Sequence, residues 1–384
     1  MRILMVRANQ GYPDSRVEKE IYSLSKENDV ELLGWDRTCD QKNISNRNVK
    51  INDKVFNYHL FCISAPQGGG FKKTLLPMLK FWNRVSAYLK KYQDKYDVIH
   101  FCDFDTAGMA FSFVNRKKTK IVYDIFDYYA DSHNAPKAIS SLIKKRENYI
   151  INHSNAVILC SEKRKEQITP ASNKNTVIIH NAPSQDIKLK KIHIQGNENS
   201  LPKAKLVYVG MLSNDRYLKD IGNVIIHHPE VEWHVGGFGV LSSYFEQLAQ
   251  DYPNIFFYGK LAYSETLYLE SKCDIMTAIY DPNVPNHKYA APNKFYESLM
   301  LEKPVIMMKN TGMDQIVDKY SLGRVIDLNN GDFQSLFEKA LLKLSQEKER
   351  NSKRKQEKCI YEEYFSWNIM EKRLLGVYRC LDQI

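Results

Sequence analysis

The amino-acid sequence predicts an α/β protein with two successive domains, each built on a doubly wound parallel β-sheet. Its 384 residues exceed what a single hydrophobic core usually organises. Short apolar runs alternate with segments of helical periodicity, which is typical of βαβ units. This alternation stops at residues 186–202 and then starts afresh. Two consecutive Rossmann-like domains therefore account for both the length and the pattern.

The first domain is expected to span residues 1–185. Its opening apolar run at residues 3–6 predicts a buried strand, and a polar loop and a helix over about residues 16–25 follow. Because the later runs are equally short and mostly apolar, they fit strands buried on both faces of a parallel sheet. These further strands are expected at residues 30–34, 96–100, 120–124, 155–159 and 176–179.

The second domain is expected to span residues 203–364, after a polar linker at residues 186–202 with little apolar periodicity. Residues 365–384 predict an amphipathic helix, which we expect to return to the first domain. Ligands of doubly wound sheets bind at the carboxyl ends of the strands, so a site is expected in a cleft between the two domains. The strands of the second domain are expected at residues 205–210, 232–236, 255–258, 274–278, 304–308 and 324–327.

The formal net charge of +10 suits nucleic acid, an anionic membrane face or phosphate-bearing substrates. No cluster of basic and aromatic residues supports nucleic acid, which is therefore not an expected partner. The seven cysteines are scattered without a Cys-x-x-Cys pair, which favours a reducing cytoplasm and argues against a zinc site. The start lacks the features of a signal peptide, and no run of eighteen apolar residues occurs. We expect a cytoplasmic protein.

Several motifs in order along the chain resemble those of glycosyltransferase family 4. The most specific is PNKFYESLMLEKPVI at residues 292–306, and DSRVEKE at residues 14–20 is similar to a loop and helix near the family's N-terminus. Weaker matches occur at residues 96–100, 155–161, 177–181, 208–210, 235–237, 257–259 and 273–274. The resemblance implies a GT-B fold, a nucleotide-sugar donor (a UDP- or GDP-sugar), a retaining transfer, and a saccharide or lipid-linked saccharide acceptor in cell-surface glycan synthesis.

The resemblance also implies roles for individual residues of the second domain. Arg216 occupies the place of a phosphate-binding cation, and Lys294 lies three residues before Glu297 in a helix-starting loop. Both cations would stabilise the charge that develops on the departing diphosphate. Glu297 matches the second glutamate of the family's Glu-x7-Glu motif, which accepts hydrogen bonds from ribose hydroxyls. The first glutamate of that motif is replaced by Tyr289.

Other residues of the second domain are expected to line the donor site through their backbones or hydroxyl groups. Gly210 and Gly237 follow strands, where glycine permits close approach to a nucleotide. The amide of Asn293 lies at a helix start, where phosphate binds readily. Thr311 and Gly312 lie in a comparable loop after the strand at residues 304–308.

On the acceptor side, the predicted residues follow the strands of the first domain. Asp14 and Arg16 follow the first strand, and Asp103 follows the strand at residues 96–100. Asp127 is a catalytic candidate, together with Arg216 and Lys294, because it matches the aspartate of a His-Asp pair found in many family members. Phe126 occupies the histidine position. Neither a metal nor another cofactor is expected, although Asp103-Phe-Asp105 has the form of an Asp-x-Asp motif.

Residues 68–84 combine glycine, lysine and bulky apolar side chains, with leucines recurring at helical spacing. This segment could dock on an anionic membrane that holds a lipid-linked acceptor, or could pack on the sheet as an ordinary amphipathic helix. Three other functions remain open: a GT-B sugar-nucleotide epimerase, an inverting transferase, and a non-catalytic nucleotide-sugar-binding module.

Overall fold

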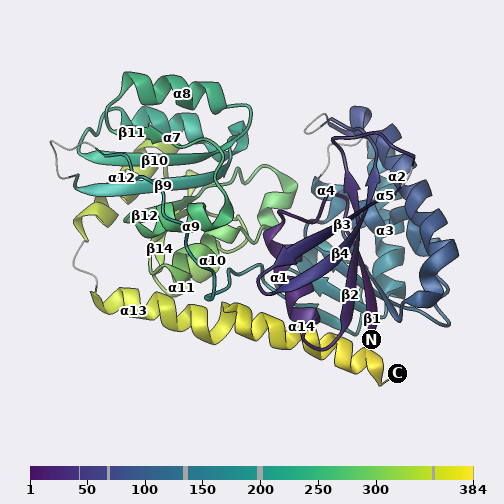
Figure 1. Ribbon diagram of the computed structural model, residues 1–384. Coiled ribbons are helices and arrows are strands. Elements are labelled where there is room, and N and C mark those ends of the chain that lie inside the picture. The colour runs from purple at the N-terminus through teal and green to yellow at the C-terminus, as the bar shows by residue number, and fades with distance from the viewer. Residues whose placement is uncertain (43, 67–69, 133–136, 197–201, 348–350, 384) are drawn as a thin grey trace. The chain divides into compact units, whose positions relative to one another are not determined.

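The computed structural model describes residues 1–42, 44–66, 70–132, 137–196, 202–347 and 351–383. The chain divides into two compact units (Figure 1). The first comprises Met1–His180 and Met370–Ile384, and the second comprises Asn181–Ile369. Each unit contains one large sheet, so the predicted α/β class with two parallel sheets is confirmed.

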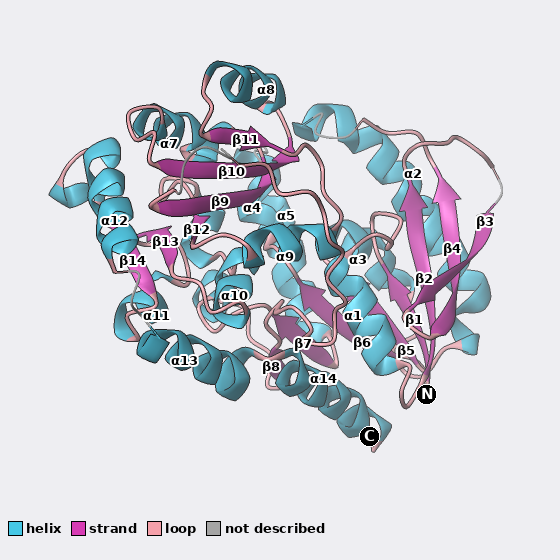
Figure 2. Ribbon diagram, turned by 60° about the vertical axis from the view of Figure 1, so that its left-hand side comes forward, coloured by secondary structure: helices cyan, strands magenta, loops and turns pink. Residues whose placement is uncertain are grey.

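The first sheet has eight strands in the order β3-β4-β2-β1-β5-β6-β7-β8. All neighbouring strands are parallel except β3 and β4, which form an antiparallel edge pair (Figure 2). Neither strand was predicted; β3 (ISNRNVKI) is largely polar and exposed, whereas β4 (KVFNYHLFC) is mostly buried and was missed despite its apolar residues. The strands are β1 (Arg2–Val6), β2 (Asp29–Asp36), β3 (Ile44–Ile51), β4 (Lys54–Cys62), β5 (Val98–Cys102), β6 (Lys120–Ile125), β7 (Ala156–Leu159) and β8 (Thr176–Ile178).

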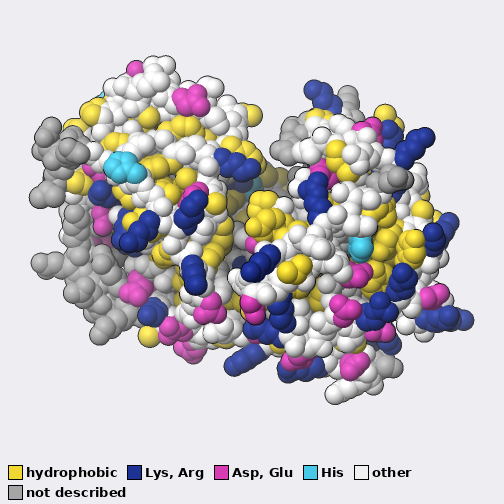
Figure 3. Space-filling view, viewed as in Figure 1, with side chains coloured by type: hydrophobic (Ala, Val, Ile, Leu, Met, Phe, Trp, Pro, Cys, Tyr) yellow, Lys and Arg dark blue, Asp and Glu magenta, His cyan; other side chains and the backbone are white. Residues whose placement is uncertain are grey.

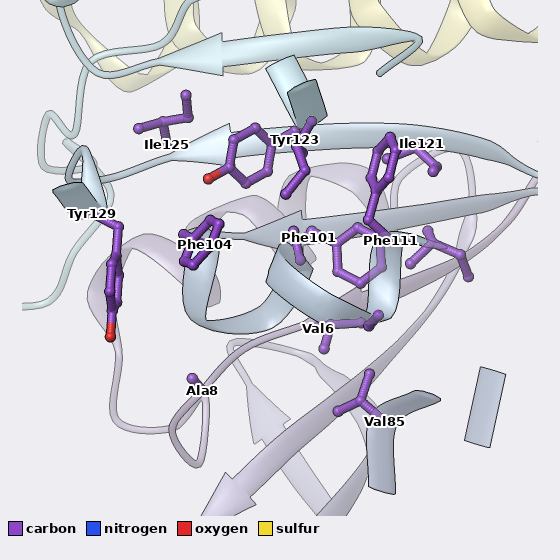
Figure 4. Close-up of a cluster of buried hydrophobic side chains, with 14 of the residues drawn as sticks. Val6, Ala8, Val85, Phe101, Phe104, Phe111, Ile121, Tyr123, Ile125 and Tyr129 are labelled. Carbon is purple, nitrogen blue, oxygen red and sulfur yellow. The ribbon is translucent and has the colours of Figure 1, made fainter. Parts of the chain in front are cut away.

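Helices cover both faces of this sheet, as its alternating buried side chains require. One face packs against α2, α3 and α5 in a cluster that includes Phe101, Phe111 and Tyr123, part of which is shown in Figure 4. The other face meets α1 and α14, where Tyr378 contacts His100. The helices of this unit are α1 (Ser15–Leu24), α2 (Gly70–Tyr92), α3 (Phe104–Ala110), α4 (Tyr129–Ser132), α5 (Lys137–His153), α6 (Arg164–Gln167) and α14 (Trp367–Asp382), which begins three residues before the boundary.

The second sheet has six parallel strands in the order β11-β10-β9-β12-β13-β14. Its strands are short and apolar, and each predicted run of the second domain coincides with one of them to within two residues. The strands are β9 (Ala204–Met211), β10 (Val231–Phe238), β11 (Ile255–Phe257), β12 (Ile275–Ala278), β13 (Val305–Met308) and β14 (Gly323–Ile326).

Alternate residues of the central strand β9 belong to separate hydrophobic clusters on the two faces of this sheet. Leu206 and Tyr208 pack with α7, α8 and α12, whereas Val207 and Val209 pack with α9, α10 and α11. This period-two division is what a strand covered on both faces produces. The helices of the unit are α7 (Leu218–Ile225), α8 (Ser242–Asp251), α9 (Tyr263–Ser271), α10 (Asn293–Met300), α11 (Asp314–Lys319), α12 (Phe333–Gln346) and α13 (Asn351–Ile360).

The segment predicted as a linker, residues 186–202, is part of the second unit. Residues 186–196 form neither helix nor strand, and residues 197–201 lie outside the described part of the chain. Ile192 and Ile194 nevertheless pack against the cluster on the α10 face of the second sheet. Two apolar side chains therefore pack this segment against the rest of the second unit, which its polar composition did not indicate.

The surface carries charges of both signs. On the face drawn in Figure 3, Lys and Arg side chains are interspersed with Asp and Glu. Within the described residues, no helix combines the length and the apolar character needed to cross a bilayer.

Candidate functional site

The second sheet reverses its direction of growth between β9 and β12. The chain adds β10 and β11 on one side of β9, and then β12, β13 and β14 on the other. In doubly wound sheets, ligands bind beside the carboxyl ends of the strands at such a switch point. Arg216 lies in the loop after β9, in a short 3-10 helix (Asn214–Arg216), and Lys294 and Glu297 lie on α10, which follows β12. The fold thus brings these three predicted donor residues to one end of the sheet.

The guanidinium of Arg216 is held by hydrogen bonds at one nitrogen and by an aromatic ring. Its Nη1 donates to the carboxylate of Asp215 at 2.7 Å and lies 3.0 Å from Nε2 of His287. Its central carbon lies 4.0 Å from the ring centroid of Tyr280, a cation–π distance. Among the described residues, Nε and Nη2 of Arg216 donate to no acceptor. The group is therefore a fixed cation with two donor positions left for an anion.

Lys294 provides a second cation at the end of β9. Its ammonium lies 4.8 Å from the ring centroid of Tyr208. Burial by itself would lower the pKa of Lys294, but the phenol groups of Tyr208 and Tyr280 and the carboxylate of Glu297 raise it above its ordinary value. A Cβ atom at Gly210 would lie 2.7 Å from the ammonium, so the absence of a side chain at Gly210 leaves room for the charge. Lys294 is thus charged throughout the physiological pH range.

Glu297 projects from α10 and is almost completely buried, with 3% of its surface exposed. Tyr263, on α9, donates a hydrogen bond to its carboxylate, and burial together with Glu297 and Glu270 raises the pKa of Tyr263 well above its ordinary value. Glu270 is itself 1% exposed, and burial, followed by the charge of Glu297, raises its pKa strongly. A carboxylate offers about four lone-pair positions, and the bond from Tyr263 occupies one of them on Glu297.

Two predicted glycines are required by the packing of the loops around the site. Gly237 (φ +128°) faces Gly210 across β9 and β10, and a Cβ atom there would lie 1.8 Å from the Gly210 carbonyl oxygen. Gly312 (φ +87°) lies against the backbone of Ala290, and a Cβ atom there would lie 1.8 Å from the Ala290 carbonyl oxygen. Both positions therefore exclude any side chain, whatever else they contact.

The remaining predicted donor residues form bonds within the unit. Thr311 is fully buried, and its hydroxyl donates to the carbonyl of Met308 at 2.5 Å. The side chain of Asn293 accepts a 2.8 Å bond from Asn181. The side chains that surround Arg216 were not predicted. Asp215 precedes Arg216 directly, whereas no motif of the sequence indicated the part played by His287.

The first sheet has its own switch point between β1 and β5, and two of the predicted acceptor-side residues meet there. Arg7, which was not predicted, bridges them: Nε lies 3.2 Å from the Asp14 carboxylate and Nη1 lies 2.6 Å from the Asp103 carboxylate. Asp103 has a backbone φ of +66°, which is rare outside glycine and is a form of strain often found at functional sites. Burial raises the pKa of Asp103 well above its ordinary value, although Arg7 opposes the shift.

Arg16 belongs to α1 and points into the interior. Its side chain is about 4% exposed, with Nη2 2.7 Å from Asp124 and Nε 2.9 Å from Glu20. The two carboxylates and His100 form a group with metal-ligand character, but the guanidinium of Arg16 already supplies its positive charge. A second such group, Asp36 with two cysteines, is also satisfied in part, because Asp36 accepts bonds from Thr38 and Arg47.

Asp127 is partly exposed, with 58% of its side chain accessible, and Arg164 donates to it at 2.7 Å. Phe126, at the position of the expected histidine, is flanked by the guanidinium groups of Arg7 and Arg16 at 4.3 and 4.4 Å from the ring centroid. The aromatic ring therefore lies at cation–π distance from both guanidinium groups, and no imidazole is available at this position.

The sequence of the chain matches no protein-family model. It also has no significant match among curated proteins.

Solved structures with the same fold do exist. Sucrose-phosphate synthase from Thermosynechococcus elongatus aligns over 100% of both chains, with a TM-score of 0.75 and 14% identity. The catalytic domain of starch synthase IV from Arabidopsis thaliana, solved with ADP and acarbose, also aligns over 100% of both chains, with a TM-score of 0.70 and 12% identity. HepE from Anabaena, solved with UDP, also aligns over 100% of both chains, with a TM-score of 0.66 and 12% identity. The likeness establishes the GT-B fold that the sequence predicted.

Proposed function

We propose that this protein is a retaining glycosyltransferase, similar to those of family 4, that transfers a sugar from a nucleotide-sugar to a saccharide or lipid-linked saccharide acceptor. The observation that carries the proposal is the pair of cations at the switch point of the second sheet. Arg216 reaches it from the loop after β9 and Lys294 from the first turn of α10, and Arg216 keeps two donor positions without a protein partner among the described residues. A GT-B fold with nucleoside diphosphates in its structural relatives supports a diphosphate as the anion.

In the proposed reaction, the bond between the anomeric carbon and the diphosphate breaks, and negative charge develops on the departing phosphate oxygens. The fixed guanidinium of Arg216 and the ammonium of Lys294 stabilise that charge, because they are oriented before the donor binds. Glu297 accepts hydrogen bonds from the ribose hydroxyls. The departing phosphate takes the acceptor's proton during attack on the same face of the sugar. The proposal includes no metal or other cofactor.

The acceptor is proposed to bind beside the switch point of the first sheet, where Asp14 and Asp103 are held by Arg7. Asp127 follows β6 of the same sheet, has an exposed carboxylate and is proposed to orient an acceptor hydroxyl. A lipid-linked acceptor and a peripheral membrane location are supported by α2, which exposes Leu75, Leu76 and Leu79. Residues 68 and 69, which belong to the predicted membrane segment, lie outside the described part of the chain.

The test is calorimetric titration of the protein with UDP, GDP and ADP, followed by assays of sugar release and of the product anomer. Arg216→Ala and Glu297→Ala are each expected to weaken binding of the preferred nucleoside diphosphate by about tenfold or more, because each removes a charged hydrogen-bonding group. Lys343→Ala, which removes an exposed cation on α12, is the matched control and should bind normally. Unchanged affinity in both site variants would refute the assignment. Binding without turnover would indicate a non-catalytic module, and an inverted anomer an inverting enzyme.

A further inference from the structure

His287 is a buried histidine whose two ring nitrogens have unlike partners. It lies in a short 3-10 helix (Pro285–Tyr289) between β12 and α10, and 7% of its surface is exposed. Its Nδ1 lies 2.8 Å from the carbonyl oxygen of Asp281, and its Nε2 lies 3.0 Å from Nη1 of Arg216. A carbonyl can only accept a hydrogen bond and a guanidinium can only donate one. Both contacts therefore select the same neutral tautomer, with the hydrogen on Nδ1 and the lone pair on Nε2.

The charged groups around the imidazole are consistent with this neutral form. Burial lowers the pKa of His287, and the positive charge of Arg216 lowers it as well. The Asp281 carbonyl and the carboxylates of Asp215 and Asp281 oppose this shift, but the net pKa is lowered. The Asp215 carboxylate lies 3.4 Å from Nε2, and the Tyr280 ring lies 5.1 Å from the imidazole between centroids, in a T-shaped arrangement. An imidazolium would direct a hydrogen at Asp215 and compete with Arg216 for that carboxylate.

The contact with His287 also determines which donors of Arg216 are left for a ligand. Nη1 is shared between the Asp215 carboxylate and His287, while the Tyr280 ring covers one face of the guanidinium. The plane and rotation of the group are then fixed, and the edge formed by Nε and Nη2 is the one without partners among the described residues. A bidentate contact with a phosphate needs such an edge in a defined direction.

We propose that His287, as a neutral hydrogen-bond acceptor, is a positioning residue that orients Arg216 toward the diphosphate of the donor. The inference rests on the proposed function, since it requires that Arg216 bind the diphosphate. His287 itself does not touch the donor. Its contribution is to hold the guanidinium in one orientation before binding, which spares the ordering cost that a mobile arginine would add.

Two substitutions distinguish the roles of the two ring nitrogens of His287. In His287→Gln, the amide oxygen reaches the position of Nε2 and can accept from Arg216, while the donor to Asp281 is lost. In His287→Asn, the amide nitrogen reaches the position of Nδ1 and can donate to the Asp281 carbonyl, while the acceptor for Arg216 is lost. A residue that only anchored the loop through Asp281 would tolerate asparagine and not glutamine.

The measurement is calorimetric affinity for whichever of UDP, GDP and ADP the wild-type protein binds. His287→Asn is expected to weaken binding about tenfold, which corresponds to about 1.4 kcal/mol, and His287→Gln to stay within about threefold of wild type. In an Arg216→Ala background, His287→Asn should cause no further loss, because its effect passes through Arg216. Equal affinity in the two single variants, the reverse order, or an undiminished loss in the Arg216→Ala background would each overturn the proposal. A wild-type protein that binds none of the three nucleotides would instead refute the proposed function.

Discussion

Replacement of Gly237 by alanine should damage the second unit far more than an ordinary glycine substitution. A Cβ atom at Gly237 would lie 1.8 Å from the carbonyl oxygen of Gly210, and real Cβ atoms are essentially never closer than 3.0 Å to another heavy atom. The difference, 3.0 minus 1.8, means that β9 and β10 would have to separate locally by at least 1.2 Å. The neighbouring bond from Leu212 to Phe238, now 2.9 Å long, could not survive such a displacement.

The expected cost of Gly237→Ala combines two terms. The loss of one or two backbone hydrogen bonds costs about 1–3 kcal/mol, and alanine at a φ of +128° adds about 1–3 kcal/mol of backbone strain. We therefore expect a loss of roughly 2–6 kcal/mol, which lies in the upper part of the range that single substitutions cause. Because Gly237 lies at the carboxyl end of its strand, the separation would also disturb Gly210 and the ammonium of Lys294 that lies against it.

Two other glycines provide matched controls. Gly259→Ala has a φ of +62° but open space around the added Cβ atom, so only backbone strain of about 1–2 kcal/mol is expected. Gly376→Ala lies in α14 with nothing within 4 Å of the added atom, and should stabilise by about 0.5–1 kcal/mol. Urea unfolding would measure all three variants, and hydrogen exchange of the β9 and β10 amides would show whether Gly237→Ala separates these two strands. A loss in Gly237→Ala no larger than in Gly259→Ala would show that the strands adjust freely and that this reasoning is wrong.

Two further predictions concern buried polar groups of the first unit. Burial raises the pKa of Glu147 to about 8, so the folded protein retains a proton that the unfolded chain releases near its ordinary pKa. The free energy of unfolding should therefore fall by up to about 1.4 kcal/mol per pH unit as the pH rises from about 5 to 8. In urea titrations at several pH values, Glu147→Gln should lose this part of the pH dependence. An equal pH dependence of stability in the variant and the wild type would count against the prediction. Tyr378→Phe should cost about 1–3 kcal/mol, because the hydroxyl lies 2.6 Å from Nδ1 of the fully buried His100, and a thermal unfolding midpoint equal to that of wild type would contradict the predicted loss.

The strand order along the chain could be predicted because each central strand is a short apolar run. The runs at residues 205–210 and 304–308, for example, lie within one or two residues of β9 and β13. The edge strand β3 escaped prediction for the opposite reason. A polar strand such as β3 at the sheet edge, with largely exposed side chains, has no strong hydrophobic pattern to reveal it.

The candidate site divides in a similar way. Arg216, Lys294 and Glu297 were predicted as donor-site residues because their residue types and their places relative to strands and a helix start resemble a family pattern. His287 and Tyr280 were not, because a histidine or a tyrosine in a loop has no local signature of holding an arginine. Their effect depends on distances of 3.0 and 4.0 Å to a side chain more than sixty positions away in the sequence.

By itself, then, the sequence determined the α/β class and the two series of strands, and it indicated the cations of the proposed donor site, since these depend on local apolar pattern and residue type. The tertiary structure alone decided which groups orient those cations. It placed Arg216 against His287, and it enclosed Arg16 with Asp124 inside the first unit. The physical reason is that hydrogen bonds and ion pairs act over about 3 Å in space, and distances of that kind between remote residues arise only when the sheets have formed.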